Sequence, residues 1–418
     1  MGHCLQGIGF LGFGTVGYGA YTIMKEKKQT IADRTGVNLV PIRALVRDMK
    51  KSRSVDPDCL EFSTDINTIT NDSNIHIVIE AMGGVSPAFE YISACLLSGK
   101  HVVTANKEVM AKHGKEIHLL AEQCGRLVFF EACVGGGIPI IQTLETCLHG
   151  NDFSRFAGII NGTTNYILTK MEQENSDFSN ALKDAQVLGY AESDPTADVD
   201  GFDTLYKVVL LCEVMFGVYV DWMDIPRKGI QQIRKSDMEF AKTHEYRIKL
   251  IGMAEQNSDG IFARVEPMML PKSHPLTAVN DVYNGIMVTG DHVGDLIQIG
   301  RGAGSFPTGS AVVNDVIRVA NHSASLSKRQ QRSTKLSVSS GKRTRPIPYY
   351  LHWNHYADPA LFPLRIKEMI LSVMEHPTDG MFFITHRINE DEIMWLSAHL
   401  DNLQERDSSL LVMPMDVF

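Results

Sequence analysis

The chain has 418 residues, of which 44% are hydrophobic and 21% charged, and its formal net charge is -9. This length allows two or three domains, and this composition is that of a globular protein with a sizeable core. The acidic balance argues against general binding to nucleic acid. The seven cysteines form no CxxC pair, which favours reduced thiols over a disulfide framework or a zinc site. The N-terminus has no signal-peptide pattern and no apolar run reaches the ~20 residues that span a bilayer, so we expect a cytoplasmic protein without a membrane partner.

A glycine-rich turn near the N-terminus joins an expected strand to an expected helix. The short apolar strand 5–11 leads into GFGTVG, and a helix-like segment follows over 16–27. A second strand is expected over 39–46. A GxGxxG motif in this strand–turn–helix–strand context indicates dinucleotide binding.

Each position of this turn has a physical role in holding a dinucleotide. Gly12 allows the tight turn, Gly14 lets the backbone approach a pyrophosphate, and Gly17 lets the helix pack on the strand. The helix N-terminus, with Thr15 and Val16, then faces the phosphates.

The residues after the second strand bear on the choice between NADP and NAD. NAD-specific folds usually place an acid there, to hold the ribose hydroxyls. Here Arg47 takes that position, and a guanidinium can grip a ribose phosphate, which favours NADP. Asp48 follows directly and could still serve NAD.

Strand-like and helix-like segments continue to alternate up to residue 130. The expected strands are 75–79, 101–104 and 127–130, and the expected helices are 87–97 and 111–124. This alternation predicts an α/β fold with a Rossmann-type doubly wound parallel sheet, whose ligands bind beyond the carboxyl ends of the strands. Two such ends carry Lys107, in TANKE, and Glu131, in EACVGGGIP. The plain alternative for Lys107 is a surface residue in a first helical turn, where the helix dipole does not favour a cation.

Residues 187–211 contain an acidic run followed by a lysine in an apolar helix. Asp203 and Lys207 are four residues apart on the helix expected from residue 202 to residue 216, so they share one side of it. A surface ion pair of this kind contributes only roughly 0.3–0.5 kcal/mol. A lysine between Tyr206 and Val208 cannot easily reach water, so it must be paired or lose its proton. Both conditions suit proton transfer to or from a substrate oxygen.

Six motifs together resemble the homoserine dehydrogenase family, in the family's order and spacing. They are GFGTVG, TANK, EACVGGGIPI, NGTTNYIL, GYAESDPTADVDGFDTLYK and GRGAGSFPTGSAVVNDV. The resemblance covers roughly residues 5–320. It implies the reduction of L-aspartate 4-semialdehyde to L-homoserine with NADPH or NADH, in threonine, methionine and isoleucine biosynthesis.

The resemblance implies roles for five residues of the reaction site. Lys207 resembles the family's catalytic lysine, which donates a proton to the aldehyde oxygen, and Lys107 resembles the lysine near the nicotinamide. Glu192 is similar to the carboxylate that binds the substrate's amino group. Asp198 and Asp203 match acids that orient the substrate and the lysine. The chemistry of the reaction agrees with these roles. The substrate ammonium needs a buried acid, and hydride addition puts negative charge on the carbonyl oxygen, which a neighbouring lysine can neutralise and protonate.

Further residues enter through the same resemblance. Gly162 and Thr163, in NGTTNYIL, are expected to bind substrate, and Gly304, in GRGAG, to contact the cofactor. A sodium ion is expected in a loop that offers one carboxylate and three backbone carbonyls, from Glu131, Val134, Gly136 and Ile138.

The chain is expected to divide into four parts. They are a nucleotide-binding domain over 1–150 with 305–322 returning to it, an α+β substrate and dimerisation domain over 151–304, a basic serine-rich linker over 323–348, and a C-terminal domain over 349–418. In the second part the expected strands are 153–160, 247–254, 261–265, 286–289 and 296–299, and the expected helices are 164–173, 178–188, 203–217 and 225–242. The linker is interpreted as a solvated tether, with a nucleic-acid patch as the alternative.

The C-terminal part resembles an ACT domain, the α+β module through which many bacterial members of the family sense threonine. The expected elements are strand 349–353, helix 361–374, strand 381–385, helix 390–403 and strand 410–415. Two features depart from that pattern: the turn at 357–360 reads ADPA, and the second strand is shortened between residues 375 and 380. The resemblance implies a threonine effector, against which these two departures argue, and a homodimer or homotetramer is expected.

Two alternatives remain for the function. The first is a non-catalytic amino-acid sensor on the same fold, against which the presence of Lys107, Glu192, Asp203 and Lys207 argues. The second is a dehydrogenase for a different semialdehyde or amino acid, against which the motif at 189–207 argues.

Overall fold

The computed structural model describes residues 4–51, 53, 60–258, 260–322, 343, 345–402 and 409–417. These divide into two compact units. The first is built from Met1–Asn151, Val209–Trp222 and Gly300–Lys335, and the second from Asp152–Val208, Met223–Ile299 and Leu336–Phe418. Most of the predicted linker, 323–348, lies outside the described residues.

The first unit is organised around a six-stranded parallel sheet with the order β3-β2-β1-β4-β5-β6. Its strands are β1 (Cys4–Leu11), β2 (Val37–Leu45), β3 (Glu61–Ser63), β4 (Ile77–Glu80), β5 (His101–Thr104) and β6 (Val128–Phe129). The strand order reverses between β1 and β4, which makes the carboxyl ends of these two strands the topological switch point. The predicted Rossmann-type doubly wound sheet is confirmed.

Helices accompany this sheet along the chain. They are α1 (Thr15–Glu26), α2 (Lys28–Thr35), α3 (Asn67–Thr70), α4 (Ala88–Leu97), α5 (Lys107–Cys124), α6 (Ile140–Gln142) and α12 (Ser305–His322), with the short turns η1 (Glu131–Cys133) and η2 (Thr143–Cys147). Among the described residues, no helix combines the length and the apolar character needed to cross a membrane.

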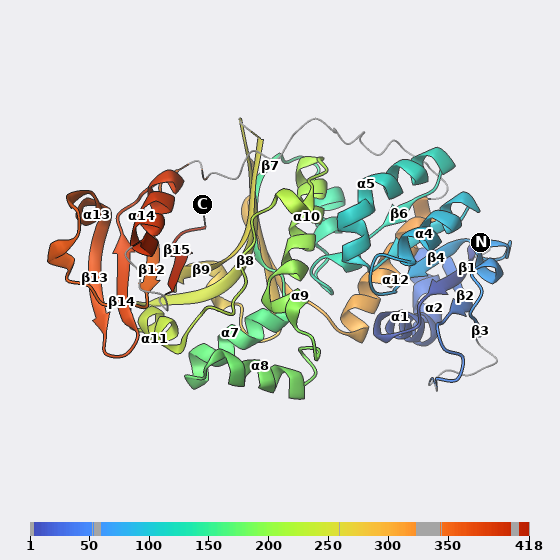
Figure 1. The fold of residues 1–418 in the computed structure, drawn as a ribbon. Helices are drawn as coiled ribbons and strands as arrows, with labels where there is room; N and C mark the ends of the chain where they lie inside the picture. The colour runs from blue at the N-terminus through green and yellow to red at the C-terminus, as the bar shows by residue number, and fades with distance from the viewer. Residues whose placement is uncertain are drawn as a thin grey trace. The chain divides into compact units, whose positions relative to one another are not determined.

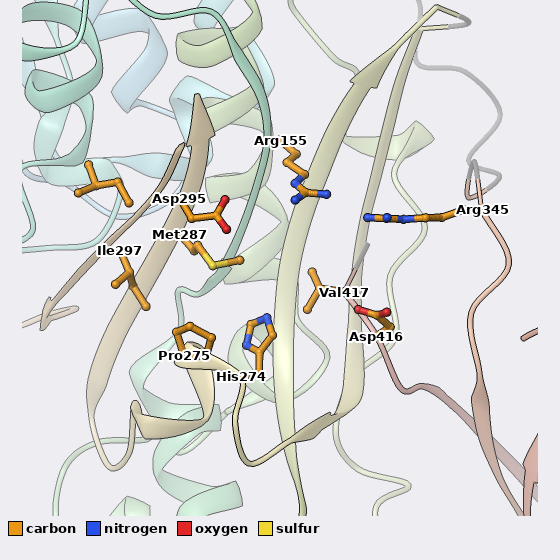
Figure 2. Close-up of a pocket in the computed structure, with 10 residues that line it drawn as sticks. Arg155, His274, Pro275, Met287, Asp295, Ile297, Arg345, Asp416 and Val417 are labelled. Carbon is orange, nitrogen blue, oxygen red and sulfur yellow. The ribbon is translucent and has the colours of Figure 1, made fainter. Parts of the chain in front are cut away.

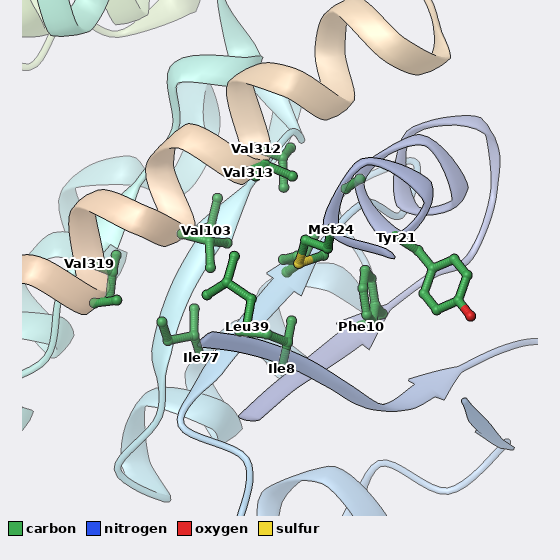
Figure 3. Close-up of a cluster of buried hydrophobic side chains, with 14 of the residues drawn as sticks. Ile8, Phe10, Tyr21, Met24, Leu39, Ile77, Val103, Val312, Val313 and Val319 are labelled. Carbon is green, nitrogen blue, oxygen red and sulfur yellow. The ribbon is translucent and has the colours of Figure 1, made fainter. Parts of the chain in front are cut away.

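Helix α12 is far from α1 in sequence but packs directly against it (Figure 1). The two helices approach closely at Gly309, where a Cβ atom would lie only 2.7 Å from the backbone nitrogen of Ala20. Only a glycine leaves room for this contact. Figure 3 shows Val312, Val313 and Val319 of α12 among the side chains of the sheet, together with Met24 of α1. The returning helix therefore completes the core of the first unit.

The second unit contains a five-stranded sheet with the order β11-β10-β7-β8-β9. Its strands are β7 (Phe153–Ile159), β8 (Tyr246–Asn257), β9 (Gly260–Pro271), β10 (Tyr283–Gly290) and β11 (Gly294–Arg301), and β10, β7, β8 and β9 pair antiparallel in that order. The other elements are α7 (Gly162–Glu174), α8 (Phe178–Val187), α9 (Thr196–Val199), α10 (Phe202–Phe216), η3 (Trp222–Asp224), α11 (Lys235–Thr243) and η4 (Pro275–Ala278). Helix α10 spans the division between the two units, which falls after Val208.

The helix expected over 225–242 is wrong for its first ten residues, because only Lys235–Thr243 is helical. Arg227 instead forms a bridge with Val265 of β9, where the N–H of Lys228 donates to the Val265 carbonyl at 2.8 Å. Pairing with an existing strand satisfies the backbone of this segment without a helix.

The C-terminal part of the second unit forms a separate four-stranded sheet with the order β13-β14-β12-β15. Its elements are β12 (Tyr349–Trp353), η5 (Pro359–Leu361), α13 (Leu364–Met369), β13 (Ile370–His376), β14 (Gly380–Thr385), α14 (Glu390–Asn402) and β15 (Leu410–Pro414). All neighbouring strands pair antiparallel. The β-α-β-β-α-β sequence is that of a ferredoxin-like module.

Two expectations for this module are wrong. The helix expected over 361–374 ends at Met369, and the second strand is not shortened, since β13 runs from Ile370 to His376. Strand β13 pairs with β14 over its whole length, so Ile370 and Val373 lie in a sheet that their β-branched side chains favour.

Candidate active site

Of the three glycines in the turn between β1 and α1, only one has open space where a side chain would lie. A Cβ atom at Gly12 would lie 2.7 Å from the carbonyl oxygen of Ala81, and Gly12 has φ +89°. A Cβ atom at Gly17 would lie 2.7 Å from the carbonyl oxygen of Gly12. At Gly14 no atom lies within 4 Å of the Cβ position. Gly12 and Gly17 are therefore needed by the fold, whereas Gly14 leaves room for a ligand.

Helix α1 begins directly after Gly14, so its first backbone N–H groups point towards that space. Thr15 is exposed and Val16 half-buried at this helix end. N–H groups in a first helical turn have no acceptor within the helix and bind phosphate well. These residues could hold the pyrophosphate of a dinucleotide.

Arg47 and Asp48 both lie exposed just beyond the carboxyl end of β2. The side chain of Asp48 accepts a hydrogen bond from the N–H of Lys50 at 2.8 Å, and its carbonyl accepts one from the Arg53 guanidinium at 2.8 Å. Asp48 thus shapes the loop locally, while Arg47 stands beside it. Both residues remain candidates for contact with a ribose.

Lys107 is the first residue of α5 and lies half-buried beyond the carboxyl end of β5. Asn106 precedes it and caps the helix, since its Oδ1 accepts from the N–H of Val109 at 3.1 Å. The fully buried carboxyl of Glu80, at the end of β4, contacts the side chains of Thr104 and Asn106. Glu80 was missed by the sequence analysis, because it reads as one acid at the end of an apolar strand.

Glu131 is buried, and both of its carboxylate oxygens accept hydrogen bonds from the start of α6. Oε1 accepts from the N–H of Ile141 at 2.8 Å, and Oε2 accepts from the N–H of Gln142 at 2.6 Å. Its own N–H donates to Oδ2 of Asp315 at 2.8 Å. Burial, and after it the charge of Asp315, raise the pKa of Glu131 to about 8.

The predicted cation loop is compatible with a hard cation in its chemistry. A carboxylate offers about four lone-pair sites, so the two N–H donors leave acceptor capacity on Glu131. Carboxylate and backbone carbonyl oxygens are the ligands that hard cations prefer. Among the described residues, no group of three or more His, Cys, Asp or Glu side chains is arranged to hold a metal ion.

The turn that carries Gly304 packs against this loop. The N–H of Gly137 donates to the carbonyl of Arg301 at 3.0 Å, and a Cβ atom at Gly136 would collide with the Gly302 backbone. Ser305 Oγ donates to the carbonyl of Thr15 at 2.8 Å. Gly304 itself has φ +127°, a conformation that only glycine adopts readily. The structure therefore brings the cation loop, the Gly304 turn and the start of α1 together within the first unit.

The second unit holds a buried lysine–carboxylate cluster. Nζ of Lys207 donates to Oδ2 of Asp203 at 2.6 Å and to the carbonyl of Ile160 at 2.6 Å. Both side chains are nearly inaccessible, with 6% of each residue exposed. The predicted pairing on a buried helix is confirmed, and the alternative of a solvated surface pair is wrong.

Asn161 joins this cluster and was missed as an individual residue. Its Nδ2 donates to Oδ1 of Asp198 at 2.6 Å and to Oδ2 of Asp203 at 2.8 Å. Its Oδ1 caps α7 by accepting from the N–H of Thr164 at 2.8 Å. The only sequence signal was its place at the head of NGTTNYIL, where an asparagine before a helical run indicates an N-cap.

Gly162 and Thr163 begin α7 next to this cluster. A Cβ atom at Gly162 would lie 2.8 Å from the carbonyl oxygen of Val282, so the backbone is tightly packed there. Thr163 Oγ1 donates to the carbonyl of Tyr190 at 2.7 Å, which ties the segment before Glu192 to α7. Glu192 itself is exposed, so the expectation of a buried acid at this position is wrong.

A separate cavity of about 280 Å³ also lies in the second unit (Figure 2). Its lining combines two arginines, a histidine and two aspartates with apolar side chains: Arg155, Arg345, His274, Asp295, Asp416, Met287 and Val417. None of the predicted catalytic or substrate-binding residues is in that lining, as far as the described residues go.

A parallel sheet whose glycine turn has room for a dinucleotide, in a chain with a buried lysine–aspartate pair, is typical of a nicotinamide-dependent oxidoreductase. Residues 12–131 match the family model described as the NAD binding domain of homoserine dehydrogenase, and residues 139–317 match the model described as homoserine dehydrogenase. The chain belongs to the homoserine dehydrogenase family.

Individual relatives agree with this assignment over nearly the whole chain. The homoserine dehydrogenase of Lactococcus lactis is 36% identical over an alignment that covers 97% of both chains. A homoserine dehydrogenase structure from Thiobacillus denitrificans superposes with a TM-score of 0.92 at 33% identity, over 99% of this chain and 98% of that one. A hyperthermophilic archaeal homoserine dehydrogenase in complex with NADPH matches 75% of this chain and 97% of its own, with a TM-score of 0.65 and 28% identity. The reading as a non-catalytic sensor finds no support in these matches.

Proposed function

We propose that the chain reduces L-aspartate 4-semialdehyde to L-homoserine, with Lys207 as the proton donor to the aldehyde oxygen. The observation that carries this proposal is the buried contact of 2.6 Å between Lys207 Nζ and Asp203 Oδ2. A bound reduced nicotinamide supplies the hydride, and the protein must then neutralise and protonate the oxygen that becomes negative. Asp203 keeps the ammonium of Lys207 in a defined direction and balances its charge, without which burial would be costly.

The residues around this pair are proposed to hold the amino-acid part of the substrate. Glu192 binds the substrate ammonium, and Asp198 orients it from the side of Asn161. Gly162 and Thr163 are the first two residues of α7 and are proposed to contact the substrate. The hydrogen bond from Thr163 to Tyr190 supports the segment that carries Glu192. An exposed carboxylate is accessible to an incoming ammonium, which supports this role.

In the first unit, the nicotinamide dinucleotide is proposed to lie along Gly12, Gly14, Thr15, Val16 and Gly17. Arg47 would contact a ribose phosphate, which favours NADP, and Asp48 keeps NAD as the alternative. Lys107 and Gly304 are proposed as further contacts of the cofactor, with Lys107 near the nicotinamide. The open space at Gly14 supports the placement of the pyrophosphate.

A sodium ion is proposed for the loop of Glu131, Val134, Gly136 and Ile138. The buried carboxylate of Glu131 supports this, because a hard cation prefers carboxylate and backbone carbonyl oxygens as ligands.

The assembly and regulation of the chain are proposed from the family resemblance. We infer a homodimer or homotetramer in the cytoplasm, with the four parts 1–150 plus 305–322, 151–304, 323–348 and 349–418. The ferredoxin-like order of the C-terminal module supports an ACT-like domain. Threonine is proposed as its effector.

The proposed reaction is tested by following NADPH and NADH oxidation by the purified protein with L-aspartate 4-semialdehyde, with and without threonine. Turnover supports the assigned substrate, and the ratio of the two cofactors tests Arg47. Absence of turnover with both cofactors, in protein shown to be folded, would refute the assigned substrate. Inhibition by threonine would support the effector proposal, and a rate independent of threonine would contradict it.

A further inference from the structure

Glu80 is a fully buried carboxyl at the topological switch point of the first unit. It is the last residue of β4, the strand between β1 and β5, and its exposed fraction is 0%. Ligands of doubly wound sheets bind beyond the carboxyl ends of the strands at this point. The groups that hydrogen-bond to its oxygens in the described part of the chain are an amide side chain, a hydroxyl and a backbone N–H, all uncharged. A buried acid held in this way calls for an explanation.

The carboxyl of Glu80 joins two loops that leave neighbouring strands. Oε1 accepts from the N–H of Met82 at 2.7 Å, in the loop after β4, and from Nδ2 of Asn106 at 3.4 Å, in the turn after β5. Oε2 is hydrogen-bonded to Oγ1 of Thr104. The same Asn106 Nδ2 also donates to the carbonyl of Gly84 at 2.7 Å. Glu80 is thus the common acceptor of both loops.

These contacts lead directly to Lys107. The N–H of Asn106 donates to Thr104 Oγ1 at 3.0 Å, and Asn106 Oδ1 caps the helix that Lys107 begins. Thr104 and Asn106 are themselves buried, so both packing and these hydrogen bonds restrict the conformation of the turn. The direction in which Lys107 leaves the sheet is therefore set by groups that Glu80 holds.

Hydrogen bonding favours the ionised form of Glu80, whereas burial disfavours it. The ionised form accepts from Met82, Asn106 and the Thr104 hydroxyl, whereas a proton on Oε2 would turn the contact with Thr104 around. Burial raises the pKa of Glu80 to about 7, and the hydrogen bonds from Thr104, Met82 and Asn106 oppose that rise. These three donors stabilise the buried carboxylate of Glu80 at the end of β4.

We propose that Glu80 is a positioning residue that fixes the Thr104–Lys107 turn against the loop after β4, and thereby aims Lys107 for hydride transfer. The proposal rests on the proposed role of Lys107 near the nicotinamide. A misplacement of about 1 Å at a site of this kind can cost about 100-fold in rate, so a contact remote from the substrate is sufficient.

The first test compares Glu80→Gln with Thr104→Val, which removes the hydroxyl at nearly constant shape, and with Thr104→Ser, which restores it. Glu122→Gln, at an exposed position of α5, is the matched control. With NADPH and the semialdehyde, kcat should fall about 10–100-fold in Glu80→Gln and Thr104→Val, and recover in Thr104→Ser. The kinetic isotope effect on kcat with NADPH deuterated at the transferred position should rise in the same two variants, since the hydride step becomes slower.

The second test asks whether Glu80 acts through Lys107. Glu80→Gln should add little to the loss already caused by Lys107→Ala, because a positioning residue loses its effect when its target is removed. Independent, multiplying effects in the double variant would overturn the proposal. A Lys107→Ala variant with wild-type turnover would by itself refute the assigned role of Lys107, and would overturn the positioning route with it.

Folding is controlled separately. A folded Glu80→Gln variant with the kcat, KM and isotope effect of the wild type would overturn the proposal. If Glu80→Gln does not fold, kcat, KM and the isotope effect are measured in Thr104→Val instead. Wild-type values in that variant would also overturn the proposal.

Discussion

The side-chain amide of Asn161 donates a hydrogen bond of 2.8 Å to Oδ2 of Asp203, the same oxygen that accepts from Lys207 Nζ at 2.6 Å. The amide nitrogen also reaches Oδ1 of Asp198 at 2.6 Å, and the amide oxygen caps α7. One asparagine thus orients two carboxylates and begins a helix. Because it is 4% exposed, its contacts are not shared with bulk water.

Asn161→Ser and Asn161→Ala should separate these two roles. Serine keeps an N-cap acceptor but loses the amide donor, whereas alanine loses both. We expect kcat to fall about 10–100-fold in both variants, because Asp203, which holds Lys207, loses the hydrogen bond from the amide. Only the alanine variant should lose a further ~1 kcal/mol of folding free energy, measured by denaturant unfolding. Wild-type kcat in Asn161→Ser would show that the amide donor has no part in orienting the pair.

Lys207→Ala should abolish measurable turnover and leave NADPH affinity nearly unchanged, because the lysine belongs to the second unit and the glycine turn to the first. Turnover and cofactor fluorescence titration measure the two effects. Lys235→Ala, at an exposed lysine of α11, is the control and should behave as the wild type. A collapse of cofactor affinity in Lys207→Ala would mean that the assigned role is wrong.

Glu192→Gln should chiefly raise KM for the amino-acid substrate, by roughly 10-fold, because the carboxylate that faces the substrate ammonium becomes a neutral amide. Steady-state kinetics at several substrate concentrations give this value. Glu174→Gln, at the exposed end of α7, serves as the control. If KM stays at the wild-type value, Glu192 does not bind the ammonium.

Arg47→Ala should weaken NADPH binding more than NADH binding, since only NADPH carries the ribose phosphate that a guanidinium grips. Dissociation constants for both cofactors, measured at one fixed salt concentration, give the comparison. Lys51→Ala, at an exposed position of the same loop, controls for a general change of charge. Equal losses for the two cofactors would remove the reason for preferring NADP.

Glu131 should make the ligand-free protein less stable as the pH rises. Burial, with the charge of Asp315 second, raises its pKa from 4.5 to about 8. The folded state therefore holds the proton more tightly than the unfolded state, so the stability is fully present below about pH 4.5 and is lost as pH rises through about 8. A pKa that is higher by one in the folded state than in the unfolded state corresponds to about 1.4 kcal/mol, so the loss amounts to a few kcal/mol.

Thermal unfolding of the wild type and Glu131→Gln in sodium-free buffers from pH 5 to pH 8.5 measures this slope. The glutamine variant should be less stable at acid pH, because its amide faces an N–H donor, but its Tm should vary less with pH. At pH 8, sodium chloride should raise the Tm of the wild type more than choline chloride does, and should not do so in Glu131→Gln. Equal effects of the two salts on the wild type would contradict the sodium site.

Some elements were mispredicted because local pattern and tertiary pairing disagree. Residues 225–234 have apolar spacing that suits a helix, but this stretch is bonded to β9 through Arg227 and Lys228. Ile370 to His376 continue an apparent helix in sequence, yet they pair with the neighbouring β14, with one register shift between Ile370 and Ser372. Short apolar segments suit either structure, and the available backbone partner decides between them.

The sequence by itself determined the features that depend on residues close together in the chain. The glycine turn before α1 and the pair of Asp203 and Lys207 on one helix face follow from spacings of a few residues, and the alternation of strands and helices implies the parallel sheet. Only the tertiary structure decided the partners of Asn161, Glu80 and Glu131. Asn161 and Asp203 are 42 residues apart, and Glu131 and Asp315 are 184 apart. A buried polar group takes whichever donor or acceptor the packing brings to it, and no local pattern encodes which one that is.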